Sequence, residues 1–342
     1  MMETKANNYY GTLQQPIGSG FDAASTAMDV IKGIDLSGKT AIVTGGYAGI
    51  GVETVKALVA AGAAVYVPAR SPEKAAKNLA GIPNVTILEM DLMDPASINA
   101  FADQFLALHK PLQLLINNAG VMLTPLRRDA RGYESQFSTN HLGHFQFTAR
   151  LWPALKNANG ARVVNVSSWG HHMASLDLDD PNFEHQPYDP SASYARAKTA
   201  NILFTVELDK RAQSAGIRSY SLHPGNIPGT DLGRDLSHET LSAFGIYNED
   251  GSFRHDPYNG YKNMEEGAST TIWCATSPQL ANIGGVYCED TEVALLDKEW
   301  KGYNPEKFVL TKGVLPEAVD AEKAQKLWAL SEQLTGIKFA AE

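Results

Sequence analysis

The sequence is poor in cysteine and has no long apolar run. Only Cys274 and Cys288 occur among its 342 residues, which excludes a disulfide-rich scaffold and favours a reducing compartment. No stretch approaches the about 20 apolar residues that a membrane-spanning helix needs. The N-terminal residues also lack the apolar segment of a signal peptide. We therefore expect a cytoplasmic protein with no membrane span, in which the two thiols fill core space.

Positive charge is also scarce. The 29 Lys and Arg residues face 38 Asp and Glu residues, which gives a formal net charge of −9 at neutral pH. This balance argues against nucleic acid as a partner. Repeats of solenoid length and low-complexity tracts are absent. Because 44% of the residues are hydrophobic, the chain has enough apolar material to form a core.

Motifs of two enzyme classes are missing as well. Without an H-E-x-x-H or C-x-x-C motif we expect no metal site. We interpret five histidines as polar pocket or surface residues, namely His141, His144, His171, His172 and His185. The G-x-S-x-G elbow of the α/β-hydrolases is absent too, so a serine hydrolase is not favoured.

The sequence does contain an alternation of apolar, β-branched runs with helical patterns. Strands are predicted at Thr40–Thr44, Ala64–Ala69, Val85–Met90, Leu112–Asn117, Arg162–Ser167, Ile217–Leu222 and Gly285–Cys288. Helices are predicted at Gly51–Ala61, Glu73–Leu79, Pro95–Leu108, Glu134–Lys156 and Ser193–Ala215. Apolar strands separated by helices indicate a parallel sheet that is covered on both faces. The predicted fold is therefore α/β, a single-domain, doubly wound (Rossmann-type) parallel sheet flanked by helices.

Three consecutive segments make up the chain: a predicted N-terminal arm (1–38), the domain that holds the sheet (39–297) and a C-terminal extension (298–342). The arm contains an amphipathic piece at Ala23–Ile34, and the extension has a helical pattern at Ala321–Leu334. Within the domain, His171–Ser191 and Thr230–Tyr261 are polar and irregular. Loops that leave the carboxyl ends of parallel strands line the ligand crevice, so we expect both loops to be functional.

A glycine-rich loop, TGGYAGIG at 44–51, follows the first predicted strand and opens the first predicted helix. Glycines at such a junction allow a tight turn and let backbone N–H groups approach a pyrophosphate at the helix N-terminus. The alternative is a plain strand-to-helix turn, because a glycine-rich loop alone is weak evidence. We expect a dinucleotide-binding domain in which the loop contacts the cofactor through Gly45, Tyr47, Gly49, Ile50 and Gly51.

The ends of the second and third strands bear on the choice of cofactor. A carboxylate at the end of the second strand would bind the ribose hydroxyls and repel a 2′-phosphate. Arg70 stands there instead, and its guanidinium suits a phosphate. NADP(H) is therefore favoured, with NAD(H) left open if Arg70 is only a solvated surface charge. Asp91 and Leu92 end the third strand, where Asp91 either binds the adenine or caps the next helix.

Tyr194 and Lys198 are one helical turn apart and therefore lie on the same helix face. A lysine ammonium would stabilise the phenolate, and together with a bound cationic nicotinamide it would lower the pKa of Tyr194 toward neutrality. Because the chain has 13 Tyr, a lysine four positions after one of them arises by chance about once. The pair gains meaning only from the motifs around it.

Those motifs are specific when taken together. They are NNAG at 117–120, the serine pair at 167–168, YARAK at 194–198 and HPG at 223–225. With the glycine-rich loop they make the sequence, from about Lys39 to about Glu289, resemble the short-chain dehydrogenase/reductase family. The resemblance implies an NAD(P)-dependent oxidoreductase that interconverts an aldehyde or ketone and an alcohol by hydride transfer.

The family's catalytic tetrad maps onto Asn140, Ser168, Tyr194 and Lys198. By this resemblance Ser168 binds the substrate oxygen and Tyr194 acts as general acid or base. Lys198 lowers the pKa of Tyr194 and holds the nicotinamide ribose, and Asn140 holds a water that joins Lys198 to solvent. Ser167 is the alternative to Ser168.

The resemblance carries over a further set of cofactor contacts. These are Asn118, Ala119, Gly120, Pro224, Gly225, Ile227 and Thr230, besides Tyr194 and Lys198. Thr230 comes one residue later than the family's usual threonine, so its contact with the nicotinamide stays open.

The chain departs from the common family pattern between its serine and its tyrosine. Ser168 and Tyr194 lie 194 − 168 = 26 positions apart. The insertion resembles that of the retinol-dehydrogenase-like and protochlorophyllide-reductase-like branch, which favours NADP(H) and bulky lipophilic carbonyls or alcohols. Residues of about 230–262 correspond to the family's substrate-binding segment. The apolar residues of that segment either form the wall of a substrate pocket or belong to a plain helix that packs on the domain. They are Leu232, Leu236, Leu241, Phe244 and Tyr247.

Two other function classes are set against this interpretation. A catalytically silent, nucleotide-binding regulatory protein is the alternative, because a fold does not imply activity, yet every tetrad position is occupied. An epimerase or dehydratase on a related fold would carry a G-x-x-G-x-x-G loop and a larger C-terminal domain, which are not seen. The expected partner is a small carbonyl or alcohol substrate. A homo-oligomer, common among relatives, stays open because the terminal segments could cover such interfaces.

Overall fold

The computed structural model describes residues 13–234, 236–304 and 309–341. Parts of three predicted segments lie outside the described residues: 1–12 of the N-terminal arm, Asp235 of the substrate-binding segment, and 305–308 and 342 of the C-terminal extension. Across the described ranges, no helix has both the length and the apolar character that a membrane crossing needs.

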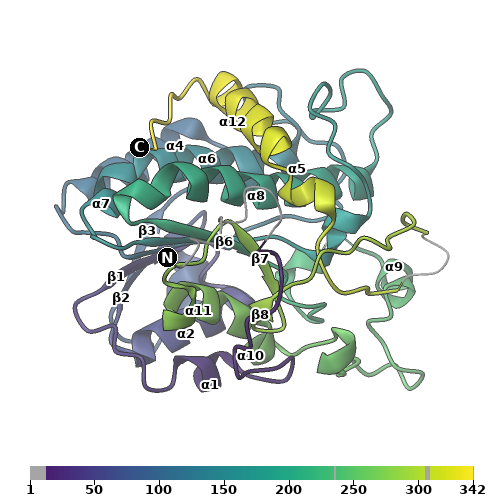
Figure 1. The fold of residues 1–342 in the computed structure, drawn as a ribbon, viewed down its shortest axis with the longest axis horizontal. Helices are drawn as coiled ribbons and strands as arrows, with labels where there is room; N and C mark the ends of the chain where they lie inside the picture. The colour runs from purple at the N-terminus through teal and green to yellow at the C-terminus, as the bar shows by residue number, and fades with distance from the viewer. Residues whose placement is uncertain (1–12, 235, 305–308, 342) are drawn as a thin grey trace, which may run out of the picture.

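Eight strands form one sheet in the order β3-β2-β1-β4-β5-β6-β7-β8 (Figure 1). Their bounds are β1 Thr40–Val43, β2 Ala64–Ala69, β3 Val85–Glu89, β4 Leu114–Asn117, β5 Arg162–Val166, β6 Arg218–Leu222, β7 Val286–Glu289 and β8 Glu292–Val293. The first seven strands pair in parallel, which confirms the predicted doubly wound sheet. All residues of β1 and β4 are buried, and burial on both faces explains their continuous apolar character.

The short strand β8 carries no signal in the sequence and runs antiparallel to β7. Cys288 pairs with Val293, and Glu289 pairs with Glu292. The two residues between them, Asp290 and Thr291, have positive φ angles of 50° and 61°. Two-residue hairpins of this kind usually have glycine at the second turn position. A threonine at that position hides the hairpin from sequence reasoning.

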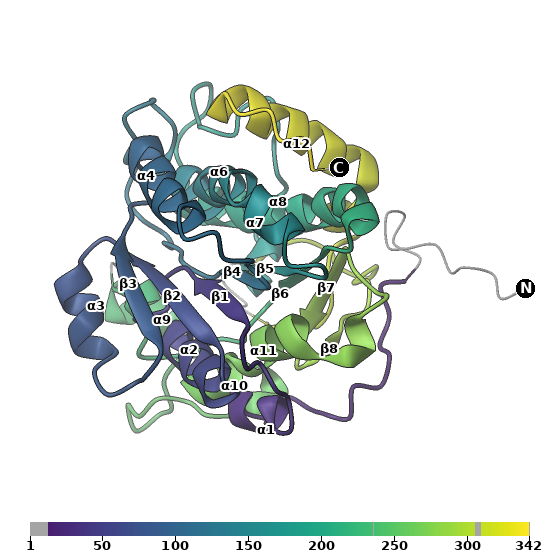
Figure 2. The same ribbon diagram turned by 90° about the vertical axis from the view of Figure 1, so that its left-hand side faces the viewer.

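Helices cover both faces of the sheet (Figure 2). One layer holds α1 (Ala27–Ile31), α2 (Ile50–Ala60), α3 (Pro72–Asn78), α10 (Met264–Gly267) and α11 (Ser269–Thr276). The other holds α4 (Pro95–Leu106), α6 (Gly143–Arg150), α7 (Trp152–Lys156), α8 (Pro190–Ala212) and α12 (Ala321–Thr335). α12 packs along α8, and its Trp328 stacks on Phe339 with ring centroids 4.8 Å apart. This part of the C-terminal extension is therefore built into the core.

The predicted helix Glu134–Lys156 is divided in the structure. α5 (Ser135–Phe137) leads into a π-helical turn at Ser138–Leu142, and α6 and α7 follow. α7 carries a proline in its first turn, where the missing N–H would have no helical partner in any case. The predicted helix Ser193–Ala215 corresponds to α8, which begins earlier, because the Asp189 carboxylate caps it by accepting the N–H of Ser191 at 2.8 Å.

Candidate active site

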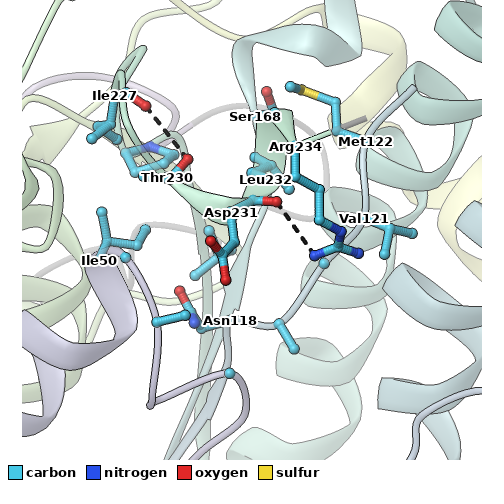
Figure 3. A pocket seen from close by; sticks show the side chains of 18 of the residues that line it. Ile50, Asn118, Val121, Met122, Ser168, Ile227, Thr230, Asp231, Leu232 and Arg234 are labelled. Atoms are coloured by element: carbon cyan, nitrogen blue, oxygen red, sulfur yellow. Dashed lines mark hydrogen bonds between the residues drawn. The ribbon is translucent and has the colours of Figure 1, made fainter. Parts of the chain in front are cut away.

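A cavity of about 740 Å³ opens at the carboxyl ends of the parallel strands. It lies where the strand order reverses between β1 and β4, the position at which open α/β sheets bind ligands. Loops after β1, β4, β5 and β6 line it (Figure 3). The predicted cofactor residues all line this cavity except Gly51.

The glycine-rich loop forms one end of the cavity. Gly45 has a φ of 65°, and a Cβ atom on it would lie 3.0 Å from the Cα atom of Ala119. Gly51 packs inside the loop, since a Cβ there would clash with the carbonyl oxygen of Gly45. Gly49, with a φ of 53°, is the N-cap of α2. The loop therefore brings bare backbone and a helix N-terminus to the cavity, a combination that binds anions.

Thr44, which sequence reasoning missed, ties this loop to the NNAG segment. Its Oγ1 accepts the N–H groups of Asn118 at 2.9 Å and Ala119 at 3.0 Å. The His144 ring lies behind it, with Nε2 2.9 Å from the same oxygen. Burial lowers the pKa of His144 to about 4, and its Nδ1–H donates to the carbonyl of Asn140 at 3.0 Å. Nε2 of the neutral ring therefore accepts from the Thr44 hydroxyl.

Cations gather where β2 ends. Arg70 is exposed and lines the cavity. Lys74, in the first turn of α3, lines it too and forms a 2.7 Å ion pair with Asp231. Sequence reasoning missed Lys74, although its spacing from Arg70 is a signal. Arg234 extends from the same segment as Asp231 toward Val121 (Figure 3).

Asp91 lines the cavity and does not cap α4, so that alternative is wrong. Its Oδ1 accepts the N–H of Met93 at 2.9 Å. The N-cap is Asp94, whose carboxylate accepts the N–H of Ala96 at 2.9 Å. Leu92 lines the cavity beside Asp91.

Ser168, Tyr194 and Lys198 meet at the other end of the cavity. The Oγ atom of Ser168 accepts the N–H of Gly170 at 2.9 Å, whereas the hydroxyl of Ser167 donates to the carbonyl of Lys198 at 2.7 Å. The Nζ atom of Lys198 donates to the carbonyl of Val166 at 3.0 Å. Ser168 is therefore the serine whose hydroxyl hydrogen is not used by the backbone.

The pKa values of Tyr194 and Lys198 are governed by burial in the chain by itself. Burial raises the pKa of Tyr194 to about 12, and the hydrogen bond with Ser168 opposes that shift only in part. Burial also lowers the pKa of Lys198 to about 8. In the chain by itself desolvation of the phenolate therefore dominates, and the predicted lowering, which also needs the bound nicotinamide, stays a prediction.

Asn140 lies behind the cavity wall and not on it. Its Oδ1 accepts the N–H of Val121 and its Nδ2 donates to the Val121 carbonyl, both at 2.9 Å. A Cβ on Gly120 would lie 3.1 Å from the Asn140 Oδ1 and 3.4 Å from the Lys198 Nζ. Asn140 thus holds the NNAG segment next to Lys198.

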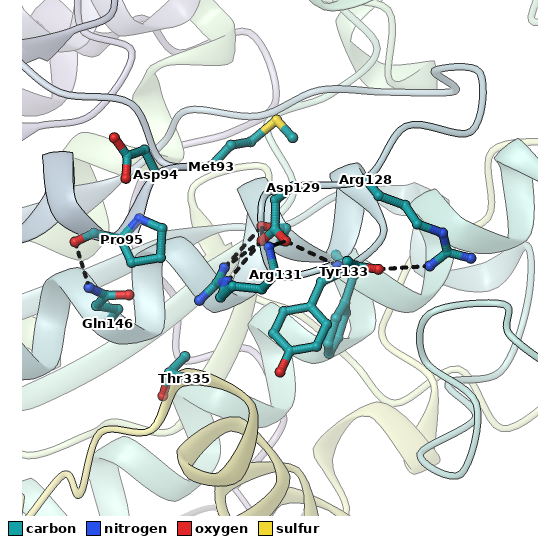
Figure 4. A network of polar contacts seen from close by, with 12 residues as sticks. Met93, Asp94, Pro95, Arg128, Asp129, Arg131, Tyr133, Gln146 and Thr335 are labelled. Carbon is teal, nitrogen blue, oxygen red and sulfur yellow. Dashed lines mark hydrogen bonds and ion pairs between the residues drawn. The ribbon is translucent and has the colours of Figure 1, made fainter.

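The π turn that carries Asn140 is fixed by a buried carboxylate (Figure 4). Asp129 accepts from the hydroxyl of Ser138 at 2.6 Å and forms an ion pair with Arg131 at 2.7 Å. Burial opposes ionisation of Asp129, but these partners outweigh it, so that the pKa of the carboxyl is lowered. The first residue of the turn is thereby anchored to the loop after β4.

The remaining wall is apolar. It is formed by Met122, Trp169, Met173, Leu232, Leu241, Phe244, Ile246, Tyr247, Phe253 and Leu310. Of the predicted wall residues, Leu236 does not line the cavity. Leu241 belongs to α9 (His238–Ala243) and also lines the cavity, so this helix contributes one residue to the wall, while Leu232, Phe244 and Tyr247 line it from outside the helix. Leu310 comes from the C-terminal extension, which sequence reasoning did not connect with the site.

The two cysteines do not line the cavity. Cys274 and Cys288 are buried thiols. Among residues 13–234, 236–304 and 309–341, no group of three or more His, Cys, Asp or Glu residues could hold a metal ion.

Known proteins resemble this chain over most of its length. The family model "short chain dehydrogenase" matches residues 39–241. A "Probable oxidoreductase" of Streptomyces lividans is 40% identical over 301 residues, covering 86% of this chain and 97% of its own. Retinol dehydrogenase 11 of Mus musculus is 36% identical, covering 89% and 88%.

Solved structures share the fold. An uncharacterised protein from Mycobacterium paratuberculosis superposes with a TM-score of 0.68 at 31% identity, covering 92% of this chain and 99% of its own. The RhlG/NADP active-site complex of Pseudomonas aeruginosa gives a TM-score of 0.58 at 23% identity, covering 74% and 94%.

Proposed function

Because this chain belongs to the short-chain dehydrogenase/reductase family, in its retinol-dehydrogenase-like branch, we propose that it interconverts lipophilic aldehydes or ketones and their alcohols with NADP(H). The observation that carries the proposal is the meeting of Ser168, Tyr194 and Lys198 in one cavity, whose other end is the glycine-rich loop.

The residues present fit a dinucleotide. Gly45 leaves a cradle that a Cβ would fill, and the N-terminus of α2 suits a pyrophosphate. Asp91 and Leu92 would hold the adenine, and the segments at 118–120 and 224–230, with Lys198, would hold the nicotinamide half. When bound, the nicotinamide supplies or accepts the hydride.

The chain itself moves the proton. Gly170 uses the Ser168 oxygen only as an acceptor, so the serine hydroxyl, which is hydrogen-bonded with Tyr194, would turn its hydrogen to a substrate carbonyl oxygen. Tyr194 is protonated at neutral pH, because its pKa is about 12, and would donate that proton in the reduction. Lys198, with a pKa of about 8, is largely charged at neutral pH and would stabilise the phenolate that results.

Two cations support the preference for NADP(H). Arg70 and Lys74 both line the adenosine end, and β2 ends without a carboxylate. A 2′-phosphate would find two positive partners there, whereas the ribose of NAD(H) lacks an acidic acceptor. The apolar wall and the similarity to retinol dehydrogenase 11 support a lipophilic substrate.

The test is a titration with NADPH and NADH, followed by nicotinamide fluorescence. We expect NADPH to bind at least about tenfold more tightly, which is about 1.4 kcal/mol. Arg70→Ala and Lys74→Ala should each reduce that preference. Arg127→Ala removes an exposed cation outside the cavity and is the control. Equal binding of both cofactors would overturn the NADP(H) preference.

Turnover separates an enzyme from a regulatory protein. NADPH oxidation is followed with decanal and with retinal, and Tyr194→Phe should abolish it. Tight NADPH binding without turnover of either aldehyde would favour the catalytically silent alternative.

A further inference from the structure

Two segments, 297–304 and 309–315, lie against the turn that follows Ser168; we call them together the tail wall, and all of it except Asp297 belongs to the C-terminal extension. The pieces pair with each other, since the N–H of Asp297 donates to the carbonyl of Val314 at 2.8 Å. Both segments lie after the end of the region that the family model matches, which is residue 241. The tail wall is therefore a feature of this chain outside the matched family segment.

Trp169 is the first point of contact. This residue follows Ser168 directly and is buried. Its ring meets the edge of Trp300 at 6.0 Å and of Tyr303 at 6.4 Å between centroids. Its Nε1–H donates to the hydroxyl of Thr311 at 3.4 Å. The tail wall thus packs against one side of the turn that follows Ser168.

His171 is the second point of contact. It is fully buried, and burial holds its pKa well below the usual range, so the ring is neutral. Its Nδ1 lies 2.7 Å from the carbonyl of Ser168 and must donate to it. Its Nε2 then accepts the N–H of Leu315 at 3.3 Å. A single fixed tautomer joins the backbone of the catalytic serine to the tail wall.

Leu310 is the third point of contact, and it reaches the cavity itself. It is seated over the turn at Gly260, where a Cβ would lie 3.0 Å from its Cδ1. Its neighbour Val309 is 52% exposed and does not line the cavity. The adjacent residues Leu310 and Val309 therefore face the cavity and the solvent, respectively.

We propose that the tail wall is part of the substrate site, with Leu310 limiting the size of the carbonyl compound and His171 acting as a positioning residue for Ser168. The size limit follows from geometry, because a side chain that lines an apolar cavity excludes whatever overlaps its volume. The positioning role follows from the two side-chain hydrogen bonds of His171, to the Ser168 carbonyl and from the Leu315 N–H. Together they fix the position of the Ser168 carbonyl relative to the tail wall. The proposal rests on the proposed function for its kinetic part only.

The role of Leu310 is tested without turnover, by binding of the apolar fluorophore 1-anilinonaphthalene-8-sulfonate. Leu310→Trp should weaken binding by about tenfold, because it fills the cavity, whereas the matched variant Val309→Trp should change it less than about twofold. NADPH binding should be the same in both variants. Equal fluorophore binding by the two variants would overturn the size limit, whatever becomes of the proposed function.

With turnover, Leu310→Trp and Leu310→Ala are compared on hexanal and dodecanal. Leu310→Trp should lower kcat/KM for dodecanal more than for hexanal, and Leu310→Ala should do the reverse. An unchanged ratio in both variants would contradict the inference.

The role of His171 is tested by two substitutions of graded severity. His171→Phe removes both hydrogen bonds, whereas His171→Asn keeps a donor near the Ser168 carbonyl. We expect kcat for decanal to fall by about 100-fold in the first and to be partly rescued in the second, with the Kd of NADPH unchanged in both. His185→Asn, at an exposed histidine of the same insertion, is the control.

Two results would overturn the positioning role. One is an equal fall in kcat in His171→Phe and His171→Asn that is accompanied by weaker NADPH binding, because this combination indicates a general structural defect. The other is an unchanged kcat. If the wild type binds NADPH but turns over no aldehyde, the proposed function and the role of His171 fail together, while the fluorophore result on Leu310 stands.

Discussion

Gly170 lies directly against the phenol ring of Tyr194: a Cβ atom on Gly170 would be 2.7 Å from the Tyr194 Cε1. The N–H of the same glycine donates to the Ser168 oxygen at 2.9 Å. One residue without a side chain therefore fixes the serine and the tyrosine relative to each other. The close approach requires glycine because backbone and ring occupy the space of any β-carbon.

Gly170→Ala tests this arrangement. The added methyl must push the 168–170 turn away from the ring, and a displacement of about 1 Å at a catalytic group costs about 100-fold in rate. We expect kcat for decanal to fall by that order while the Kd of NADPH changes little. Near-normal turnover in a folded variant would show that the turn adapts.

The pH dependence of reduction should follow Lys198. Its pKa is lowered to about 8 by burial, so its charge is present below that pH and lost above it. The rate of decanal reduction at saturating NADPH should therefore be level near pH 6 to 7 and fall through about pH 8. Lys210→Met, at the exposed end of the same helix, should leave the profile unchanged. A level profile up to pH 10 would contradict this role of Lys198.

Asp231 should oppose NADPH binding. Its carboxylate pairs with Lys74, and both side chains are about half exposed, 52% and 53%, so the pair itself contributes little to stability. Asp231→Asn removes a negative charge near the proposed phosphate site. We expect NADPH to bind about two- to fourfold more tightly at low salt, and the gain to disappear at high salt. Asp103→Asn, which breaks an exposed pair with Arg150 outside the cavity, should have no effect.

Stability should decrease with pH because of Glu289. Burial, together with the negative charge of Asp290, raises the pKa of its carboxyl from 4.5 to about 7. The folded state therefore binds more protons than the unfolded state between these values. This contribution to stability is fully present below about pH 4.5 and is lost as the pH rises through about 7.

Glu289→Gln separates that contribution from others. Glutamine keeps the oxygen that accepts the N–H of Gly313 but does not ionise. The Tm of the variant should exceed that of the wild type at pH 8 and approach it at pH 5. The exposed Glu249→Gln is the control. A wild-type Tm that does not fall between pH 5 and pH 8 would refute the prediction.

Sequence patterns predicted the sheet and the cavity-lining motifs well, because both depend on local features. Continuous apolar runs identify strands that are buried on both faces, as in β1 and β4. Motif spacing located Ser168, Tyr194 and Lys198, which the structure brings to one cavity.

What sequence patterns missed depends on burial and on long-range packing. The spacing of Tyr194 and Lys198 indicates proximity but not burial, so it does not show that desolvation raises the Tyr194 pKa in the chain by itself. Leu310 lies far along the chain from every motif, and only the fold brings it to the cavity. The π turn at Ser138–Leu142 has the composition of an ordinary helix, which hides the division of the predicted helix Glu134–Lys156.

That π turn has a consequence for how the chain tolerates changes in length. An α-helix advances about 100° per residue, and a π turn accommodates one residue beyond the α-helical repeat. Deleting His141, which lies in this turn between Asn140 and His144, would preserve almost all of the composition yet rotate Asn140 and His144 relative to each other. Asn140 holds the NNAG segment and His144 contacts Thr44 of the glycine-rich loop. The relative position of these two loops therefore depends on the number of residues in this turn, whatever the identity of its side chains.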